Sequence, residues 1–190
     1  AEACLGCLKT KTGDIVPRPF GERLFPTRRN QIISLDYMYI EAVRNDSDHK
    51  FIYVLVMKDE YSGFIELVPA EAADHDTAVQ ALSFWSARYG IPDYIRTDGG
   101  SHFVNSVIAG LCKTLGIHHD ITSPYCAFSN GSVERVNREL KRLLKLLLLE
   151  GQLPSYYWPY LLPAVMSVLN TTKIRKLGKH SPFYVGKIKK

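Results

Sequence analysis

Three acidic residues stand at positions where carboxylates can do chemistry. Asp36 lies inside an apolar run, Asp98 precedes two glycines, and Glu134 follows a flexible polar segment. An unpaired charge in a buried strand is costly, so Asp36 needs a partner. Three converging carboxylates repel one another unless a cation neutralises them, and such hard oxygen ligands suit Mg²⁺ or Mn²⁺. The three acids therefore form a candidate metal site.

Each of these acids also has an interpretation without a metal. Asp98 can be a turn residue, since Gly99 and Gly100 let the backbone bend sharply. Glu134 can stabilise the first turn of its helix through the helix dipole. A metal site requires that the strands of Asp36 and Asp98 are neighbours and that the helix of Glu134 packs across them. The residues alone leave both interpretations open.

The elements that must position the acids follow from hydrophobic periodicity and turn residues. The first three predicted strands are spaced like a meander, so we expect antiparallel neighbours. The order βββαβαβαα predicts an α/β layered domain with a mixed sheet. Asp74 or Asp76 would cap the first helix and Gly90 would stop it. The predicted elements are strands at 31–40, 51–57 and 64–68, a helix at 75–89, a strand at 93–97, a helix at 101–115, a strand at 117–121, a polar loop at 122–131, and helices at 132–150 and 159–172.

The chain divides into three predicted parts. Residues 1–30 are rich in proline, glycine and basic side chains and are predicted to be a linker, residues 31–172 the folded core, and residues 173–190 a basic C-terminal extension. From residue 130 onward twelve Lys or Arg stand against three Glu, a net of +9, which favours a polyanionic partner. A solvated helix face plus a basic tail would explain the same charge. No apolar run is long enough to cross a membrane.

The cysteines do not form a recognisable disulfide set. Cys4 and Cys7 have the spacing of half a tetrahedral zinc site, but no His or Cys precedes Cys4. We expect the missing ligands, if the pair binds zinc, to lie upstream in a longer protein, since the chain begins with Ala1. Two reduced thiols without a metal are the alternative.

The spacing and flanks of the acids resemble a known family. Sixty-one residues separate Asp36 from Asp98, and thirty-five separate Asp98 from Glu134. This resembles the Asp, Asp, thirty-five residues, Glu signature of retroviral-type integrases, including those of gypsy-type LTR retrotransposons. The match covers nearly the whole chain, and Cys4 with Cys7 resembles the second half of the family's His-His-Cys-Cys zinc module. Similar flanking motifs are Ser34-Leu35-Asp36, Thr97-Asp98-Gly99-Gly100-Ser101-His102-Phe103, Ser129-Asn130-Gly131-Ser132-Val133-Glu134-Arg135-Val136-Asn137, Leu169-Asn170-Thr171-Thr172 and His180-Ser181-Pro182-Phe183.

The resemblance implies an RNase H-like fold, with a mixed five-stranded sheet flanked by helices. It implies that Asp36, Asp98 and Glu134 are the catalytic residues and the ligands of two Mg²⁺ or Mn²⁺ ions. Such ions, about 3.5–4 Å apart, activate the attacking hydroxyl and stabilise the leaving oxygen. The implied activity is 3′-end processing and strand transfer of retroelement DNA into target DNA, carried out in the nucleus. Zinc would be an additional cofactor only if the upstream half of the Cys4 and Cys7 module is present.

The long helix predicted at 132–150 has a basic stripe that starts at Glu134. Four further polar residues recur at helical spacing on the same face, while valines and leucines form the other. A solvated surface is the alternative to DNA binding. In the preceding loop Cys126-Ala127-Phe128 departs from the family's His-Pro-Gln type of sequence. The expected DNA-contacting residues are Tyr125, Ser129, Asn130, Asn137, Arg138, Lys141 and Lys145.

Assembly and catalytic competence have alternatives as well. Leu146, Leu148 and Leu149, with Tyr156-Tyr157-Trp158, add apolar surface that can form a dimer interface, as the resemblance implies, or a deeper core. We expect a homodimer or a higher homo-oligomer. A domesticated relative could bind DNA or protein without catalysis, and a nuclease or transposase could use the same fold. The complete set of three acids favours an active enzyme, and their spacing with the Cys4 and Cys7 pair favours an integrase.

Overall fold

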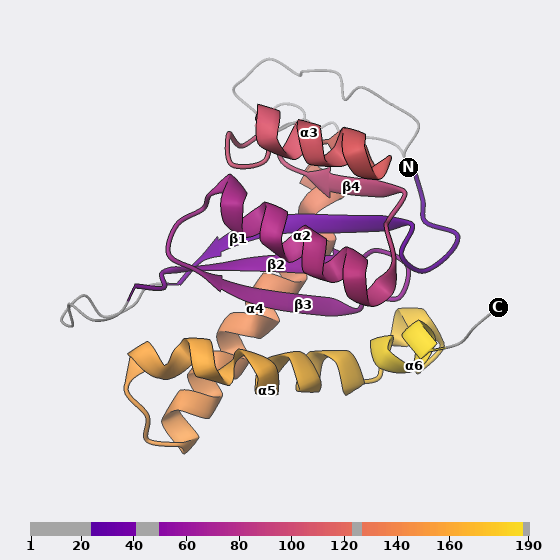
Figure 1. Cartoon of the computed structure of the whole chain (residues 1–190). Helices are drawn as coiled ribbons and strands as arrows, with labels where there is room; N and C mark the ends of the chain where they lie inside the picture. The colour runs from indigo at the N-terminus through magenta and orange to yellow at the C-terminus, as the bar shows by residue number, and fades with distance from the viewer. Residues whose placement is uncertain (1–23, 41–49, 123–126, 188–190) are drawn as a thin grey trace, which may run out of the picture.

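A computed structural model of this protein describes residues 24–40, 50–122 and 127–187, apart from the side chains of 127–134, 176, 186 and 187. It shows one mixed sheet with helices packed on both faces (Figure 1). The elements are β1 (Ile32–Tyr39), β2 (Tyr53–Asp59), β3 (Ile65–Ala70), α2 (His75–Tyr89), β4 (Tyr94–Thr97), α3 (Ser106–Leu115), β5 (His118–Ile121), α4 (Ala127–Glu150), the short 3-10 helix η1 (Ser155–Tyr157), α5 (Trp158–Thr171), the 3-10 helix η2 (Arg175–Leu177) and α6 (Pro182–Lys187).

The sheet has five strands in the order β3-β2-β1-β4-β5. β1, β2 and β3 are antiparallel neighbours, whereas β4 runs parallel to both β1 and β5. The predicted meander and mixed sheet are therefore confirmed. Ser34 of β1 is in register with Arg96 of β4. Continued by two residues, the same register brings Asp36 level with Asp98, just past the C-terminal end of β4.

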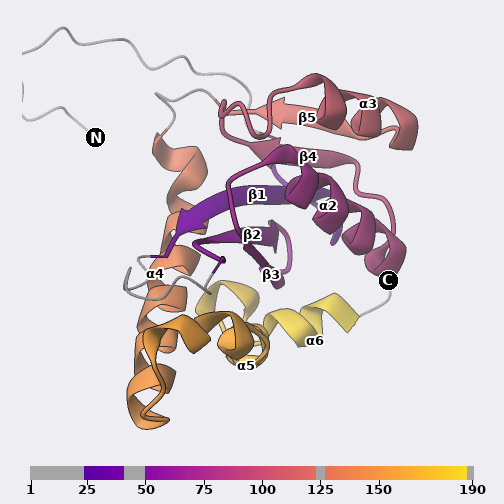
Figure 2. The same cartoon turned by 60° about the vertical axis from the view of Figure 1, so that its left-hand side comes forward.

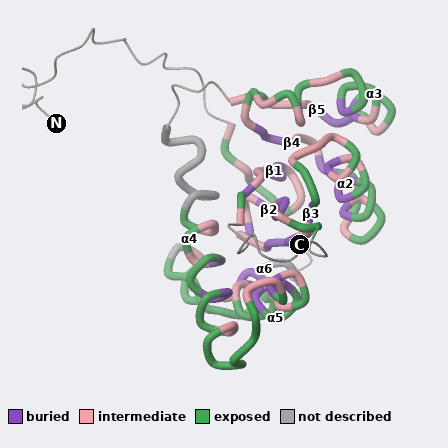
Figure 3. The backbone as a smooth tube through the Cα atoms, turned by 90° about the vertical axis from the view of Figure 1, so that its left-hand side faces the viewer, coloured by how far each residue is buried: buried purple, intermediate pink, exposed green. Residues whose placement is uncertain are grey.

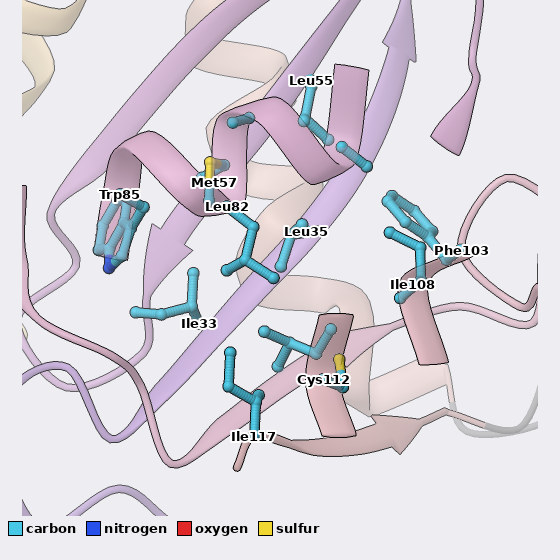
Figure 4. Close-up of a cluster of buried hydrophobic side chains, with 13 residues drawn as sticks. Ile33, Leu35, Leu55, Met57, Leu82, Trp85, Phe103, Ile108, Cys112 and Ile117 are labelled. Atoms are coloured by element: carbon cyan, nitrogen blue, oxygen red, sulfur yellow. The ribbon is translucent and has the colours of Figure 1, made fainter. Parts of the chain in front are cut away.

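The helices form a layer on each side of the sheet, with α2 and α3 on one face and α4 and α5 on the other (Figure 2). Burial is concentrated between these layers (Figure 3). The core under α2 and α3 includes Leu35, Leu55, Trp85 and Phe103 (Figure 4). The core under α4 and α5 consists of Met38, Val54, Val56, Ile65, Leu67, Leu140, Leu143, Leu144, Trp158, Leu162 and Val165.

The end residues of α2 and α3 show how side chains set helix boundaries. Asp74 Oδ1 accepts a hydrogen bond from the Thr77 N–H at 2.7 Å, which confirms the predicted start of α2. The predicted start of α3 at 101 is wrong, because the helix begins at Ser106. The Asn105 side chain caps it by accepting from the backbone N–H groups of residues 107 and 108. The turn that replaces the predicted helical residues places Phe103 in the core with 1% of its surface exposed.

Helix α4 is longer than the sequence predicts. It begins at Ala127 rather than Ser132, so the end of the loop predicted at 122–131 is helical. Asn and Gly have low helix propensity, and that argued for a loop. Once a helix is nucleated, however, each added residue gains a backbone hydrogen bond, so a long helix extends into weak helix formers.

Both ends of the described chain pack against the domain. Within the predicted linker, Arg28 Nη2 pairs with Asp93 at 2.6 Å, and Asn30 Oδ1 accepts from Trp85 Nε1 at 2.8 Å. The basic C-terminal extension contains η2 and α6, and α6 packs against α5. Neither helix has a hydrophobic periodicity, and the local signal for α6 is its start, where Ser181 Oγ accepts the Tyr184 N–H at 3.3 Å and Pro182 is the first helical residue. Among the described helices, none is long and apolar enough to cross a membrane.

Candidate active site

The site is built around Asp36, whose side chain lies on the α4 side of β1. Asn137 Nδ2 donates a hydrogen bond to Asp36 Oδ2 at 2.9 Å. This bond joins α4 to β1 across 101 positions of sequence, next to the apolar contacts that α4 makes with the sheet. Glu134 precedes Asn137 by three residues on the same helix, hence by about one turn. The backbone of α4 therefore places Glu134 next to the turn that contacts Asp36, although its side chain lies outside the described residues.

Asp98 follows the last residue of β4 and is held by its own turn. Its Oδ1 accepts the Gly100 N–H at 3.0 Å, and its side chain is 47% exposed. Asp98 and Asp36 are close enough to influence each other electrostatically. The pKa of Asp36 is raised above its ordinary value, mainly by burial and also by the negative charge of Asp98. The hydrogen bond from Asn137 and the nearby His102 act in the opposite direction and lower it. The two strand-borne acids are thus brought together.

His102 belongs to this site and was not identified from the sequence. Its Nε2 lies 3.7 Å from Asp98 Oδ1. The ring meets Tyr37 edge-on at a centroid distance of 5.2 Å and Phe103 at 4.4 Å. The sequence signal for this arrangement is the place of His102 in the motif that follows Asp98, four residues after the acid.

The backbone bends at Gly99, as the sequence predicts, and Gly100 begins a turn in which its carbonyl accepts the Phe103 N–H at 2.9 Å. Neither Gly99 nor Gly100 is among the described glycines with positive φ, so a left-handed backbone conformation is not what requires glycine here. A Cβ at position 100 would instead overlap the Cε1 atom of His102 and lie 2.8 Å from its Nε2. Gly100 is needed because the imidazole ring folds back over it.

The described groups fit a divalent cation of the Mg²⁺ type. Asp36 and Asp98 supply hard oxygen ligands, and their mutual repulsion is relieved by a positive charge. Asn137 Oδ1 is buried beside them with no hydrogen-bond partner among the described atoms. Among the side chains that the structure describes, no three His, Cys, Asp or Glu residues gather closely enough to hold a metal. A complete site therefore needs a further ligand, and Glu134 is the acid whose backbone lies in the right place.

The predicted basic stripe is on the surface of α4. Arg138, Lys141 and Lys145 are exposed, and within the described part of the chain none pairs with a carboxylate. Arg142 differs, since its Nε binds Glu139 at 2.9 Å. Lys141 and Lys145 border a groove that Trp158 also lines. Several predicted site residues fall outside the described residues: Tyr125, Cys4 and Cys7 entirely, and the side chains of Ser129, Asn130 and Glu134.

The leucine-rich end of α4 is divided between core and surface. Trp158 is 2% exposed and packs in the core under α4 and α5, which Leu148 also contacts. The deeper-core interpretation therefore holds for these two residues. Leu146, Leu149 and Tyr157 remain 41%, 66% and 39% exposed. Tyr156 is half-buried, and the exposed set of Leu146, Leu149 and Tyr157 is open to a partner.

Comparison with known proteins places this geometry in a family. The sequence model of the integrase core domain family matches residues 26–127, which is more than half of the chain. Over 169 residues the chain is 31% identical to the Pro-Pol polyprotein of simian foamy virus type 3 (strain LK3), which covers 89% of this chain and 14% of the polyprotein. The chain thus spans about a seventh of that relative.

Solved structures have the same fold. A chain of the simian T-cell lymphotropic virus intasome, solved by cryo-EM in complex with PP2A regulatory subunit B56 gamma, has a TM-score of 0.77 at 22% identity and covers 99% of this chain and 64% of that chain. The HTLV-2 integrase catalytic core domain in complex with magnesium, in its trimeric form, has a TM-score of 0.67 at 20% identity and covers 84% and 98%. The RNase H-like fold predicted from the sequence is confirmed.

Proposed function

This chain belongs to the integrase core domain family, and we propose that it is the catalytic core of an integrase that processes the 3′ ends of retroelement DNA and joins them to target DNA. The hydrogen bond from Asn137 to Asp36 is the observation that carries the proposal. It brings the helix turn next to Glu134 to the strand of Asp36, beside Asp98. An enzyme that binds divalent cations at the ends of its strands requires that the acids of β1, β4 and α4 converge in this way.

Asp36, Asp98 and Glu134 are the proposed catalytic residues and ligands of two Mg²⁺ or Mn²⁺ ions. The bound ions would activate the attacking hydroxyl and stabilise the leaving oxygen. Asn137 orients Asp36 through Oδ2, and the Gly100 N–H orients Asp98 through Oδ1. The magnesium in the HTLV-2 core supports this choice of cation. A partly buried Asp36 next to another acid is unfavourable for folding, and a catalytically silent domesticated relative has no physical reason to keep the pair.

The proposed DNA surface begins at the metal site and runs along α4. The exposed cations Arg138, Lys141 and Lys145 lie on the helix that contains Glu134. Lys and Arg contacts to phosphate position a duplex without reading its sequence, and salt weakens them. The proposed DNA-binding set is Tyr125, Ser129, Asn130, Asn137, Arg138, Lys141 and Lys145.

The remaining proposals concern the molecule as a whole. We infer a homo-oligomer that acts on DNA in the nucleus, since the HTLV-2 core is a trimer in one form and the structural relative from the simian virus is part of an intasome. The proposed parts are a linker at 1–30 with the tail of a zinc module, the catalytic core at 31–172 and a basic extension at 173–190. Zinc binding by Cys4 and Cys7 would require ligands from upstream.

A strand-transfer assay on oligonucleotides with retroelement ends tests the proposed activity, with the core in its full-length protein. Glu134→Gln should abolish joining in Mg²⁺ or Mn²⁺ while much of the DNA affinity remains, because the basic stripe is untouched. Asp76→Asn is the control, since this acid is 88% exposed in the first turn of α2. Full joining by Glu134→Gln, or equal loss in Asp76→Asn, would contradict the three-acid site.

A further inference from the structure

The imidazole of His102 is fixed more firmly than a surface histidine usually is. Tyr37 and Phe103 hold two sides of the ring, at centroid distances of 5.2 and 4.4 Å. Both supports are rigid: Tyr37 donates a hydrogen bond from its hydroxyl to the carbonyl oxygen of Asp74 at 2.7 Å, and Phe103 is 1% exposed. Tyr37 and Phe103 also stack on each other at 5.4 Å. These contacts restrict where the ring can lie.

The ring lies against the carboxylate of Asp98. His102 Nε2 is 3.7 Å from Asp98 Oδ1, which already accepts the Gly100 N–H at 3.0 Å. A distance of 3.7 Å is too long for a hydrogen bond. The imidazole therefore acts by filling the space next to Oδ1 and by the attraction between its polar edge and the carboxylate. Both effects restrict rotation of the Asp98 side chain.

Gly100 shows that the chain makes room for this contact. A Cβ at this position would overlap His102 Cε1 and approach Asp98 Oδ1 to 3.0 Å, although the backbone conformation of Gly100 does not itself require glycine. An alanine would displace either the ring or the carboxylate. The requirement for glycine thus arises from the pairing of His102 with Asp98.

We propose that His102 is a positioning residue that holds the Asp98 carboxylate in the orientation in which it binds a divalent cation. This inference rests on the proposed function, since it takes Asp98 as a metal ligand. Residues that contact a metal ligand without binding the metal hold that ligand in its orientation. Their removal typically weakens metal affinity by about 10–100-fold. His102 is placed as a positioning residue rather than as a ligand, because the carboxylate that its ring contacts is that of Asp98, at 3.7 Å.

Binding of Mn²⁺ to the 190-residue chain, followed by electron paramagnetic resonance of the free ion, tests the proposal without any DNA or turnover. His102→Ala should weaken Mn²⁺ binding by about 10-fold or more. His102→Gln should restore part of the affinity, because its amide can fill the space and face Oδ1. His118→Ala is the matched control: His118 stacks on Tyr94 at 5.2 Å, at the opposite end of β4 from Asp98.

An unchanged Mn²⁺ affinity in His102→Ala, or an equal loss in His118→Ala, would overturn the proposal. Asp36→Asn separates this outcome from failure of the metal site itself. If Asp36→Asn keeps the Mn²⁺ affinity of the parent chain, the proposed metal site is wrong. If Asp36→Asn loses Mn²⁺ and His102→Ala does not, only the role of His102 is wrong.

Gly100→Ala provides a second test that does not depend on a single variant folding well. The new methyl group should weaken Mn²⁺ binding in the parent chain because it displaces the ring. In the His102→Ala background the ring is absent, so the same change should add less than it does alone. Effects that simply add would show that position 100 and His102 act independently, and would overturn the inference.

Discussion

The two faces of the sheet are built differently, although the same strands contribute to both. On the face under α2 and α3, Ile33 and Leu35 of β1 point into a continuous apolar core. On the face under α4, their neighbours Ser34 and Asp36 face polar groups before Met38 joins the second core. One strand therefore supplies packing to one side and chemistry to the other, with a period of two residues.

The polar side is more costly to fold and more selective in its contacts. Ser34 Oγ donates to Glu60 Oε1 at 2.8 Å, and Lys58 pairs with the same carboxylate at 3.4 Å. Asp36 is satisfied by Asn137 from a helix far along the sequence. Buried polar groups must be paired in this way, whereas apolar packing tolerates many partners. In this part of β1, the residues that face α2 and α3 should therefore govern stability, and the polar residues that face α4 should govern activity.

Adjacent residues of β1 allow this comparison to be tested on one strand. Asp36→Asn should reduce strand transfer by more than about 100-fold, because the substitution removes the charge of a proposed metal ligand. The fold should persist, since Asn can still accept the hydrogen bond from Asn137. Oligonucleotide joining with saturating Mg²⁺ measures the first effect and thermal unfolding the second. An inactive variant that is also unfolded would leave no distinction between the two faces.

Leu35→Ala is the counterpart on the apolar face. Leu35 is 3% exposed, so its truncation should destabilise the fold by about 2–5 kcal/mol through reduced burial and the resulting cavity. Strand transfer by the fraction that remains folded should be close to normal. Urea unfolding gives the free energy, and activity per folded molecule is measured at low temperature. A stable Leu35→Ala protein without activity would reverse the assignment of the two faces.

The sequence predicted the regular elements well where local signals agree. The bounds of α2 match the prediction at both ends, because apolar periodicity, the cap at Asp74 and the stop at Gly90 coincide. Helix α3 was predicted too long and α4 too short, since Asn105 and the segment around Gly131 give ambiguous local signals. α6 was missed because a six-residue helix depends on docking against α5, and no periodicity reports that docking.

The site was predictable only in part, for the same reason. Resemblance to a family spacing identified Asp36, Asp98 and Glu134. The Asn137 contact with Asp36 spans 101 residues, so the sequence suggested only the helix face of Asn137 and a DNA contact. The place of His102 depends on three-dimensional packing against two aromatic rings and on the absence of a Cβ at Gly100. Local sequence rules do not contain that information.

The exposed charges on the outer surface of α4 form a third region, which differs from both cores because its substitution should change DNA binding and not stability. Arg138→Glu with Lys141→Glu should weaken DNA binding and reduce the magnitude of the log–log salt slope by roughly 0.9 for each phosphate that is no longer neutralised. Stability should change by only about ±0.5 kcal/mol, as is usual at surface positions. Fluorescence anisotropy on duplex DNA at several salt concentrations measures the affinity and its slope, and urea unfolding measures the stability. Lys113→Glu in α3 is the control, and an equal effect there would indicate general electrostatics rather than a DNA-contacting stripe.

The smallest expected effect is the dependence of stability on pH that Asp36 introduces. Burial raises the pKa of Asp36 above its ordinary value, so the folded protein holds a proton there more tightly than the unfolded chain does. The pKa of an aspartate in the unfolded chain is about 3.9. The stability contributed by this proton is fully present below that pH and is lost as pH rises through the pKa of the folded state. In metal-free buffer Asp36→Asn should therefore be more stable than the parent at about pH 7, and the advantage should shrink as pH falls towards about 4. Denaturant unfolding at three pH values across this range measures the difference. Saturating Mg²⁺ should stabilise the parent and not the variant, since only the parent keeps the ligand charge. If the stability of Asp36→Asn relative to the parent instead grows on acidification, the fold stabilises Asp36 as a carboxylate. Burial of Asp36 would then cost the parent less than proposed, and the contrast between the two faces of β1 would be weaker.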